Sequence, residues 1–169
     1  GANILMLDWL KIPVSFESRE IDKLALENEI IKAKQNGKKY FIAIANLATT
    51  MFGSVDNPDD FTTILEKHEV EYKLHIDGAY GGVVYPFSNQ KSKINFSNPK
   101  ISSITIDAHK MLQSPYGTGI FICRKGLIDN VLTKEAEYIE GMDLTLCGSR
   151  SGANAVAVWM ILFTYGPLK

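Results

Sequence analysis

A lysine follows a histidine in "SITIDAHKMLQSPYGTGIF" (residues 103–121), directly after a short run of β-type residues. Lysine is almost never fully buried unless it is paired, so Lys110 at the end of a buried strand needs a reason. An aspartate has the same placement in "KLHIDGAYGG" (residues 73–82), where Asp77 ends a second apolar run. An amine and a carboxylate at two strand ends could serve one chemical site.

Metal binding is one chemistry that these strand ends could support. The motifs would be His75-x-Asp77 and Asp107-x-His109. Each straddles a strand end, where residues i and i+2 no longer share a face, and the charge of Lys110 would repel a cation. A metal site is therefore the less favoured alternative, and no metal is assigned. Its ligands would be two imidazoles and two carboxylates, a set that suits zinc: His75, Asp77, Asp107 and His109.

Pyridoxal phosphate chemistry needs a lysine to form a Schiff base and an acid to pair with the protonated ring nitrogen. Lys110 would supply the amine and Asp77 the acid, because neighbouring strand ends of a parallel sheet can present both groups to one small ring. Lys110 has to attack as a neutral amine, which a desolvated and positively biased pocket favours. From spacing alone, an ordinary strand-end aspartate and a solvated loop lysine remain an open alternative.

The elements around these residues alternate between helices and strands. Asn57 is expected to cap the clearest helix, with Pro58 in its first position. Fully apolar strands alternating with helices predict an α/β fold with a mostly parallel sheet that helices cover on both faces. Helices are expected over residues 21–37, 57–70 and 153–166, and strands over residues 39–46, 72–77, 101–107 and 117–126.

Composition and charge narrow the classes of partner. The chain has 169 residues and a net charge of −1, which fits one domain and favours neither nucleic acid nor an anionic membrane. It has no apolar run of the length that spans a bilayer, and its first residues lack the features of a signal peptide. Cys123 and Cys147 are therefore expected to be reduced, in a cytoplasmic protein.

Several stretches together resemble one enzyme family. "HIDGAYGGVVYPF" followed by "SITIDAHKMLQSPYGTGIFICRK" is similar to the group II pyridoxal-phosphate-dependent amino acid decarboxylases, especially to the tyrosine/aspartate decarboxylase branch. "IANLATTMFGSVDN" is similar to that family's Gly-Thr-Thr loop, with Ala48 in place of a glycine. The resemblance implies the large domain of the fold-type I enzymes, which are related to aspartate aminotransferase, and pyridoxal 5'-phosphate as cofactor.

The resemblance also implies roles for five residues that contact the cofactor. Lys110 matches the Schiff-base lysine, and Asp77 matches the partner of the pyridinium nitrogen. Ala79 matches the small residue that lets the ring lie flat against the backbone. His109 matches a residue that contacts the cofactor phosphate, and Thr49 lies where the family has a threonine near the ring.

A catalytic role is implied for Tyr138, which is similar to a mobile-loop tyrosine that reprotonates the α-carbon; an ordinary packed aromatic is the alternative. The implied reaction converts an L-amino acid to its amine and carbon dioxide through a Lys110 Schiff base, in a homodimer. The rival functions are another fold-type I enzyme, such as an aminotransferase or a cysteine lyase or desulfurase, and a non-catalytic fragment of that fold.

Members of the family are much longer than this chain. Residues 1–169 are therefore expected to be the central part of the cofactor-binding large domain, without the N-terminal segment and the small C-terminal domain. Residues 153–166 would begin the helix that joins the two domains. The full-length protein is expected to be the enzyme, and this chain alone is expected to be inactive or nearly so.

Overall fold

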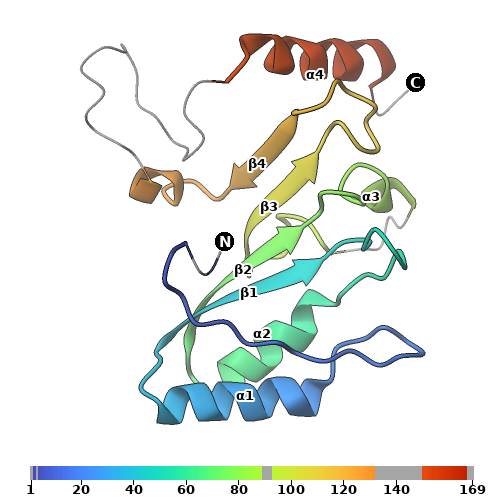
Figure 1. Cartoon of the computed structure of the whole chain (residues 1–169). Helices are drawn as coiled ribbons and strands as arrows, with labels where there is room; N and C mark the ends of the chain where they lie inside the picture. Colours follow the sequence, from blue (N-terminus) through green and yellow to red (C-terminus); the bar gives the residue numbers. More distant parts are fainter. Residues whose placement is uncertain (1, 3, 89–92, 132–149, 167–169) are drawn as a thin grey trace.

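The computed structural model describes residues 2, 4–88, 93–131 and 150–166. Every helix and strand that the sequence predicted is present, with its ends shifted by at most a few residues (Figure 1). The short helices α3 and η1 were not predicted. In chain order the elements are α1 (Lys23–Gln35), β1 (Tyr40–Asn46), α2 (Pro58–Lys67), β2 (Glu71–Asp77), α3 (Tyr85–Ser88), β3 (Ile101–Asp107), β4 (Gly119–Cys123), the 3-10 helix η1 (Ile128–Val131) and α4 (Gly152–Tyr165).

The four strands form one sheet in the order β1-β2-β3-β4. β1 pairs with β2, and β2 with β3, in parallel, whereas β3 and β4 are antiparallel. The predicted α/β fold with a mostly parallel sheet is therefore confirmed. The direction of β4 follows from its connection, because residues 108–118 form turns without a helix and parallel strands need a longer crossover.

Backbone pairing brings the polar strand ends together. Asn46 pairs with Asp77 across β1 and β2, and Asp77 pairs with Thr105 across β2 and β3. Asp107, the last residue of β3, lies opposite Gly119 of β4. The carboxyl ends of the three parallel strands thus meet at one edge of the sheet, which is where ligands of such sheets bind.

Helix α2 begins as its sequence predicts. The side chain of Asn57 accepts a hydrogen bond from the backbone N–H of Asp59 at 3.1 Å, and Pro58 occupies the first turn. Asp59 and Asp60 lie at the positive end of the helix dipole, and Lys67 lies in the last turn. Local sequence therefore sets where this helix starts, and its apolar side then sets how it packs.

The core lies between the sheet and the pair of helices α1 and α2, which cover one face of it (Figure 1). Helix α1 buries Leu26, Ile30 and Ala33. Leu24, which its spacing placed on the buried side of this helix, is instead 69% exposed. The buried cluster comprises Leu26, Ile30, Ala45, Leu47, Phe61, Ile64, Leu65, Leu74, Ile76, Ile101 and Ile104.

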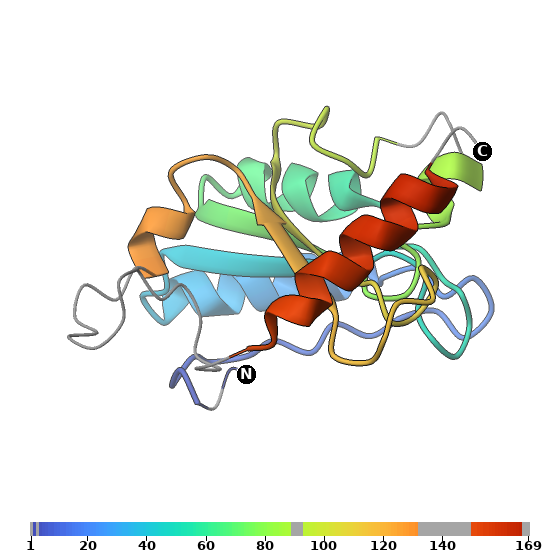
Figure 2. The ribbon, with the colours of Figure 1, turned by 90° about the horizontal axis from the view of Figure 1, so that it is seen from above.

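The opposite face of the sheet is more open than the sequence predicted, because helices were expected to cover both faces. Tyr40, Ile42 and Ile44 alternate along β1 on this open face and are 74%, 64% and 55% exposed. Helix α4 runs past the β4 end of the sheet (Figure 2), where the Asn154 side chain donates to the Gly117 carbonyl at 3.1 Å. Apolar strand residues favour burial on both sides, but they do not specify which segment provides it.

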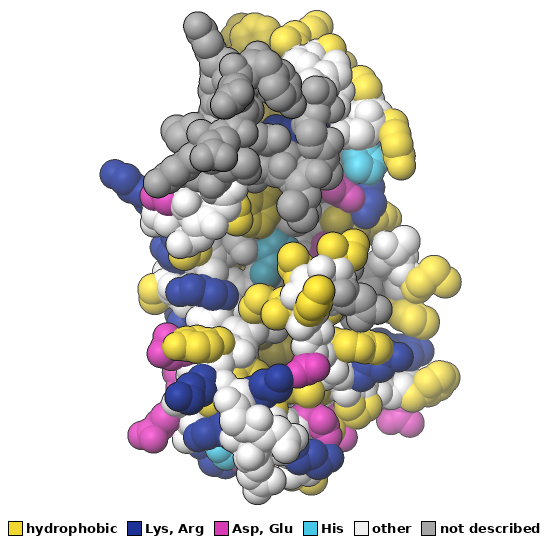
Figure 3. All heavy atoms as spheres, turned by 60° about the vertical axis from the view of Figure 1, so that its left-hand side comes forward, with side chains coloured by type: hydrophobic (Ala, Val, Ile, Leu, Met, Phe, Trp, Pro, Cys, Tyr) yellow, Lys and Arg dark blue, Asp and Glu magenta, His cyan; other side chains and the backbone are white. Residues whose placement is uncertain are grey.

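Charge is balanced on the face seen from the left of Figure 1. Lys and Arg side chains alternate with Asp and Glu over the lower half of this face (Figure 3). This alternation agrees with the net charge of −1. Among the helices of the described ranges, none has the length and apolarity needed to cross a membrane.

Candidate active site

A cavity of about 210 Å³ opens at the carboxyl edge of the parallel strands. Four of the residues that the sequence singled out line it, at or just after the ends of β1, β2 and β3. They are Thr49, Asp77, Ala79 and Lys110. The predicted Tyr138 lies outside the described residues. The other lining residues are Asn46, Ala48, Thr50 and Tyr80.

Asp77 ends β2 on the open face of the sheet, and its carboxylate is exposed. Its Oδ1 atom accepts a hydrogen bond from the backbone N–H of Ala79 at 3.1 Å. This short-range bond turns the chain sharply after the strand and keeps the carboxylate beside Ala79. A second acceptor oxygen therefore remains for a donor inside the cavity.

Two glycines let the turn after Asp77 pack closely on its neighbours. A side chain at Gly81 would place its Cβ 2.6 Å from Ala48 Cβ and closer still to the Leu47 carbonyl oxygen. A Cβ at Gly82 would lie 2.6 Å from the Gly78 carbonyl oxygen. The Gly81 N–H donates to Leu47 at 3.1 Å. The turn that carries Ala79 is therefore fastened to the loop that carries Thr49.

The loop after β1 is shaped by polar contacts that sequence reasoning did not single out. Asp56 is 9% exposed, and its Oδ2 accepts from both the backbone and the side-chain nitrogen of Asn46, each at 2.8 Å. The hydroxyls of Thr49 and Ser54 lie 2.7 Å apart. Ala48 adopts a left-handed φ of 63°, a conformation that favours glycine. The glycine of the family pattern therefore has a physical reason at this position.

Lys110 lies in a turn that begins where β3 ends. Its backbone N–H donates to the Asp107 carbonyl at 3.0 Å, and its Nζ lies 2.9 Å from Asp107 Oδ2. The Ala108 N–H donates to Thr118 at 2.8 Å, so the start and end of the connection are tied together. Lys110 is thus held by Asp107 in this structure, while it lines the same cavity as Asp77.

His109 is beside this cavity but does not line it. Its ring packs against the Tyr116 ring, with centroids 5.0 Å apart, and its Nε2 lies 3.9 Å from Asp107 Oδ2. Its Nδ1 is buried and has no hydrogen-bond partner in the part of the chain that the structure describes. A buried ring nitrogen normally has a partner, so His109 is suited to contact a bound group.

His75 is engaged within the sheet, two residues before Asp77 on the same face. Its Nδ1 lies 2.8 Å from Ser103 Oγ and its Nε2 lies 3.2 Å from Thr105 Oγ1, and its ring stacks on Phe121. Burial lowers the pKa of His75, and the negative charge of Asp77 partly offsets that effect. Within the described ranges, no group of three or more His, Cys, Asp or Glu side chains is placed to hold a metal ion.

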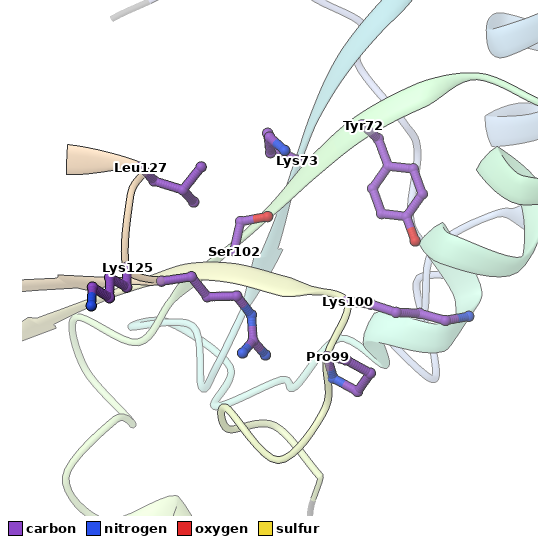
Figure 4. Close-up of a pocket in the computed structure, with 8 residues that line it drawn as sticks. Tyr72, Lys73, Pro99, Lys100, Ser102, Lys125 and Leu127 are labelled. Atoms are coloured by element: carbon purple, nitrogen blue, oxygen red, sulfur yellow. The ribbon is translucent and has the colours of Figure 1, made fainter. Parts of the chain in front are cut away.

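A larger cavity of about 480 Å³ lies at the other end of the strands (Figure 4). Several cationic side chains line it, but two of them have structural partners. Arg124 donates to the Ile101 and Asn98 carbonyls, each at 2.7 Å, and Lys100 pairs with Glu66 at 2.8 Å. Because these charges are used to fasten the loop before β3, we place the chemistry in the smaller cavity.

Comparison with known proteins identifies the family. Residues 2–167 match the pyridoxal-dependent decarboxylase conserved domain. The chain belongs to this family. The cofactor of this family is pyridoxal phosphate, in agreement with the resemblance found in the sequence.

The relatives of this chain are named as decarboxylases of several amino acids. A tryptophan decarboxylase of Clostridium sporogenes is 58% identical over 167 residues, which cover 99% of this chain and 40% of that protein. A histidine decarboxylase of Vibrio anguillarum is 36% identical over 150 residues, covering 86% of this chain and 37% of that protein. The chain thus spans about two-fifths of the length of these relatives.

Solved structures agree on the fold. A sphingosine-1-phosphate lyase of Burkholderia pseudomallei matches 98% of this chain, and 38% of its own, with a TM-score of 0.81 at 21% identity. An Oryza sativa TDC with PLP matches 98% of this chain, and 33% of its own, with a TM-score of 0.72 at 18% identity. The chain therefore shares the fold of these enzymes, in agreement with the fold-type I resemblance found in the sequence.

Proposed function

We propose that the full-length protein decarboxylates an L-amino acid to its amine and carbon dioxide. The observation that carries this proposal is the position of Asp77 and Lys110 on one cavity at the carboxyl edge of the sheet. The relative that is 58% identical is named a tryptophan decarboxylase, which makes tryptophan the first substrate to test. Bound pyridoxal phosphate would withdraw electrons from the bond to the carboxylate carbon.

The residues of the cavity fit this cofactor. Lys110 supplies the only kind of side chain that can form the Schiff-base linkage, and Asp77 can hold a negative charge at the ring nitrogen. Ala79 leaves room for a flat ring, and the Thr49 hydroxyl can donate to it. His109 Nδ1, which is buried without a partner among the described residues, can contact the phosphate.

The protein groups then act in a defined order. Lys110 Nζ would hold the cofactor by a covalent bond, and it would be the group that the substrate amine displaces and that releases the product. Asp77 would face the ring nitrogen, where a carboxylate would stabilise positive charge. Tyr138 is proposed to deliver a proton to the α-carbon after carbon dioxide has left.

We further propose a cytoplasmic homodimer. The open face of β1 and the exposed apolar side chains of α4, among them Trp159 and Phe163, support burial against further protein surface. The free thiol of Cys123 supports a reducing compartment. Residues 1–169 would then belong to the large domain, with residues 153–166 opening the helix toward the small domain.

The test is an assay of the full-length protein with tryptophan and pyridoxal phosphate, in which amine and carbon dioxide are both measured. We expect stoichiometric release of the two without any keto acid, and borohydride should fix the cofactor to the peptide that contains Lys110. Lys110→Ala should abolish both signals, whereas Lys125→Ala at the other cavity should retain them. A requirement for a keto-acid acceptor would show an aminotransferase instead.

A further inference from the structure

Lys110 has a second carboxylate within reach besides the one proposed to meet the cofactor. Its Nζ lies 2.9 Å from Asp107 Oδ2, and the side chains are 35% and 23% exposed. The two residues are three positions apart, with Asp107 on the last position of β3 and Lys110 in the following turn. The amine that the proposed chemistry requires is therefore engaged in an ion pair.

Asp107 is placed more rigidly than Lys110. Its backbone N–H donates to the Ala79 carbonyl at 3.2 Å, which joins it to the turn after Asp77. It also lies in the ladder between β3 and β4, opposite Gly119. Lys110 has four rotatable bonds between its backbone and its amine, so the lysine can move while the carboxylate stays in place.

We infer that Asp107 is a positioning residue that holds the Lys110 ammonium whenever this lysine is not bonded to an aldehyde. The inference rests on the proposed function, in which Lys110 must alternate between a bound and a released form. Asp77 lines the same cavity, and an ammonium paired with Asp77 would cover the carboxylate that the ring nitrogen needs. Asp107 draws the free lysine aside and leaves Asp77 uncovered.

The ion pair also affects how readily Lys110 reacts. Only a neutral amine attacks a carbonyl carbon, so the paired ammonium has to leave Asp107 and lose its proton first. Removing the carboxylate charge should therefore make the amine react faster with any small electrophile. That effect can be measured without cofactor.

The experiment uses the full-length protein freed of cofactor and treated with trace acetic anhydride, a neutral reagent. The acetylation rate of Lys110 is read by mass spectrometry relative to the other lysines. We expect Asp107→Asn to accelerate acetylation of Lys110 about two- to fivefold, the range for a partly exposed ion pair. Asp107→Glu, which keeps the charge, should restore most of the slow rate.

Glu29→Gln provides the matched control. It removes the partner of Lys32, another pair three positions apart with a contact of 2.6 Å, and should accelerate Lys32 while leaving Lys110 unchanged. A second measurement uses the unaltered protein, so its result does not depend on whether the variants fold. Raising the salt concentration to about 1 M shortens the screening length to about 3 Å and should speed acetylation of Lys110.

An unchanged or slower rate for Lys110 in Asp107→Asn would overturn the inference, as would the absence of a salt effect in the unaltered protein. Borohydride trapping at Lys110 is scored separately with pyridoxal phosphate. Failure of that trapping, with the acetylation effect intact, would overturn the proposed function and leave the ion pair established. Trapping without the acetylation effect would overturn only the role of Asp107.

Discussion

His75 is a residue whose pKa is shifted by its surroundings in the fold. Its ring is partly buried between Ser103 and Thr105, and burial lowers its pKa below the usual value of about 6.5. The folded protein therefore favours the neutral imidazole, whereas an unfolded chain takes up a proton near the usual value. Folding must then become less favourable as the pH falls below that value.

We predict that the free energy of unfolding decreases between about pH 7 and the lowered pKa of His75, and that His75→Gln removes this part of the decrease. Three carboxylates have a pKa lowered by lysine partners, and they lose their contribution only at lower pH, below about 4.5: Asp8, Glu27 and Glu66. Urea titrations over this range would separate the two effects. Equal slopes above pH 5 for both proteins would contradict the prediction.

For single residues, the sequence predicted which side chains belong to the candidate site better than it predicted their contacts. Asp77 and Lys110 were singled out because a charged residue at the end of an apolar strand is unusual, and the structure brings both to one cavity. The partners of Asp56 and Asp107 are set by loop geometry. Asp56 meets Asn46 across a loop of 10 residues, and Asp107 meets Lys110 within a turn. Residue spacing alone does not reveal which of several carboxylates turns toward a given amine.

The turn after β2 is the element on which the site depends most. Gly81 and Gly82 approach backbone atoms so closely that neither has room for a methyl group. The neighbours of Gly81, the Leu47 carbonyl and the Ala48 Cβ, belong to the loop of Thr49. Any shift that relieves a clash there would also move Thr49 relative to Asp77.

We predict that Gly81→Ala lowers the free energy of unfolding by about 1–3 kcal/mol, the usual cost of overpacking, and weakens cofactor binding. Gly152→Ala is the matched control, because a Cβ at this helix start meets no atom within 4 Å. It should change stability by less than about 0.5 kcal/mol. Urea unfolding and a cofactor titration by absorbance measure the two effects, and equal results for both variants would contradict the prediction.

Among the elements, local signals predicted most of the helices and strands. Asn57 and Pro58 define the start of α2, and apolar runs define the strands. The exposure of Leu24 was missed because α1 has a weak apolar stripe, and a rotation of the helix buries Ala33 instead. The short helix α3 was missed because a single turn carries no periodic pattern.

For the whole molecule, the two faces of the sheet have different roles. Helices α1 and α2 bury one face in the core, and Asp77 and His75 lie on the other. The apolar strands predicted burial on both faces, but the structure leaves Ile42 and Ile44 exposed on the second. The apolar pattern of the strands therefore predicts that both faces are buried, but it does not identify the segment that covers each face.

We predict that Leu74→Ala, at a fully buried position in the middle of β2, lowers the free energy of unfolding by about 2–5 kcal/mol. Leu24→Ala removes the same atoms from a side chain that is 69% exposed and should cost less than about 0.5 kcal/mol. Denaturant titrations of the two variants provide the comparison. Similar losses for both would contradict the packing described for α1 and β2.

The antiparallel direction of β4 has a kinetic consequence. Lys110 lies in a connection whose two strands pair with each other, from Ser103 with Cys123 to Asp107 with Gly119. Asp77 and Thr49 depend on pairings between β1, β2 and β3 that join residues about 30 positions apart. Contacts between near neighbours in the chain form faster than distant ones. The lysine side of the cavity is therefore expected to mature first during folding, and the carboxylate side to dock onto it.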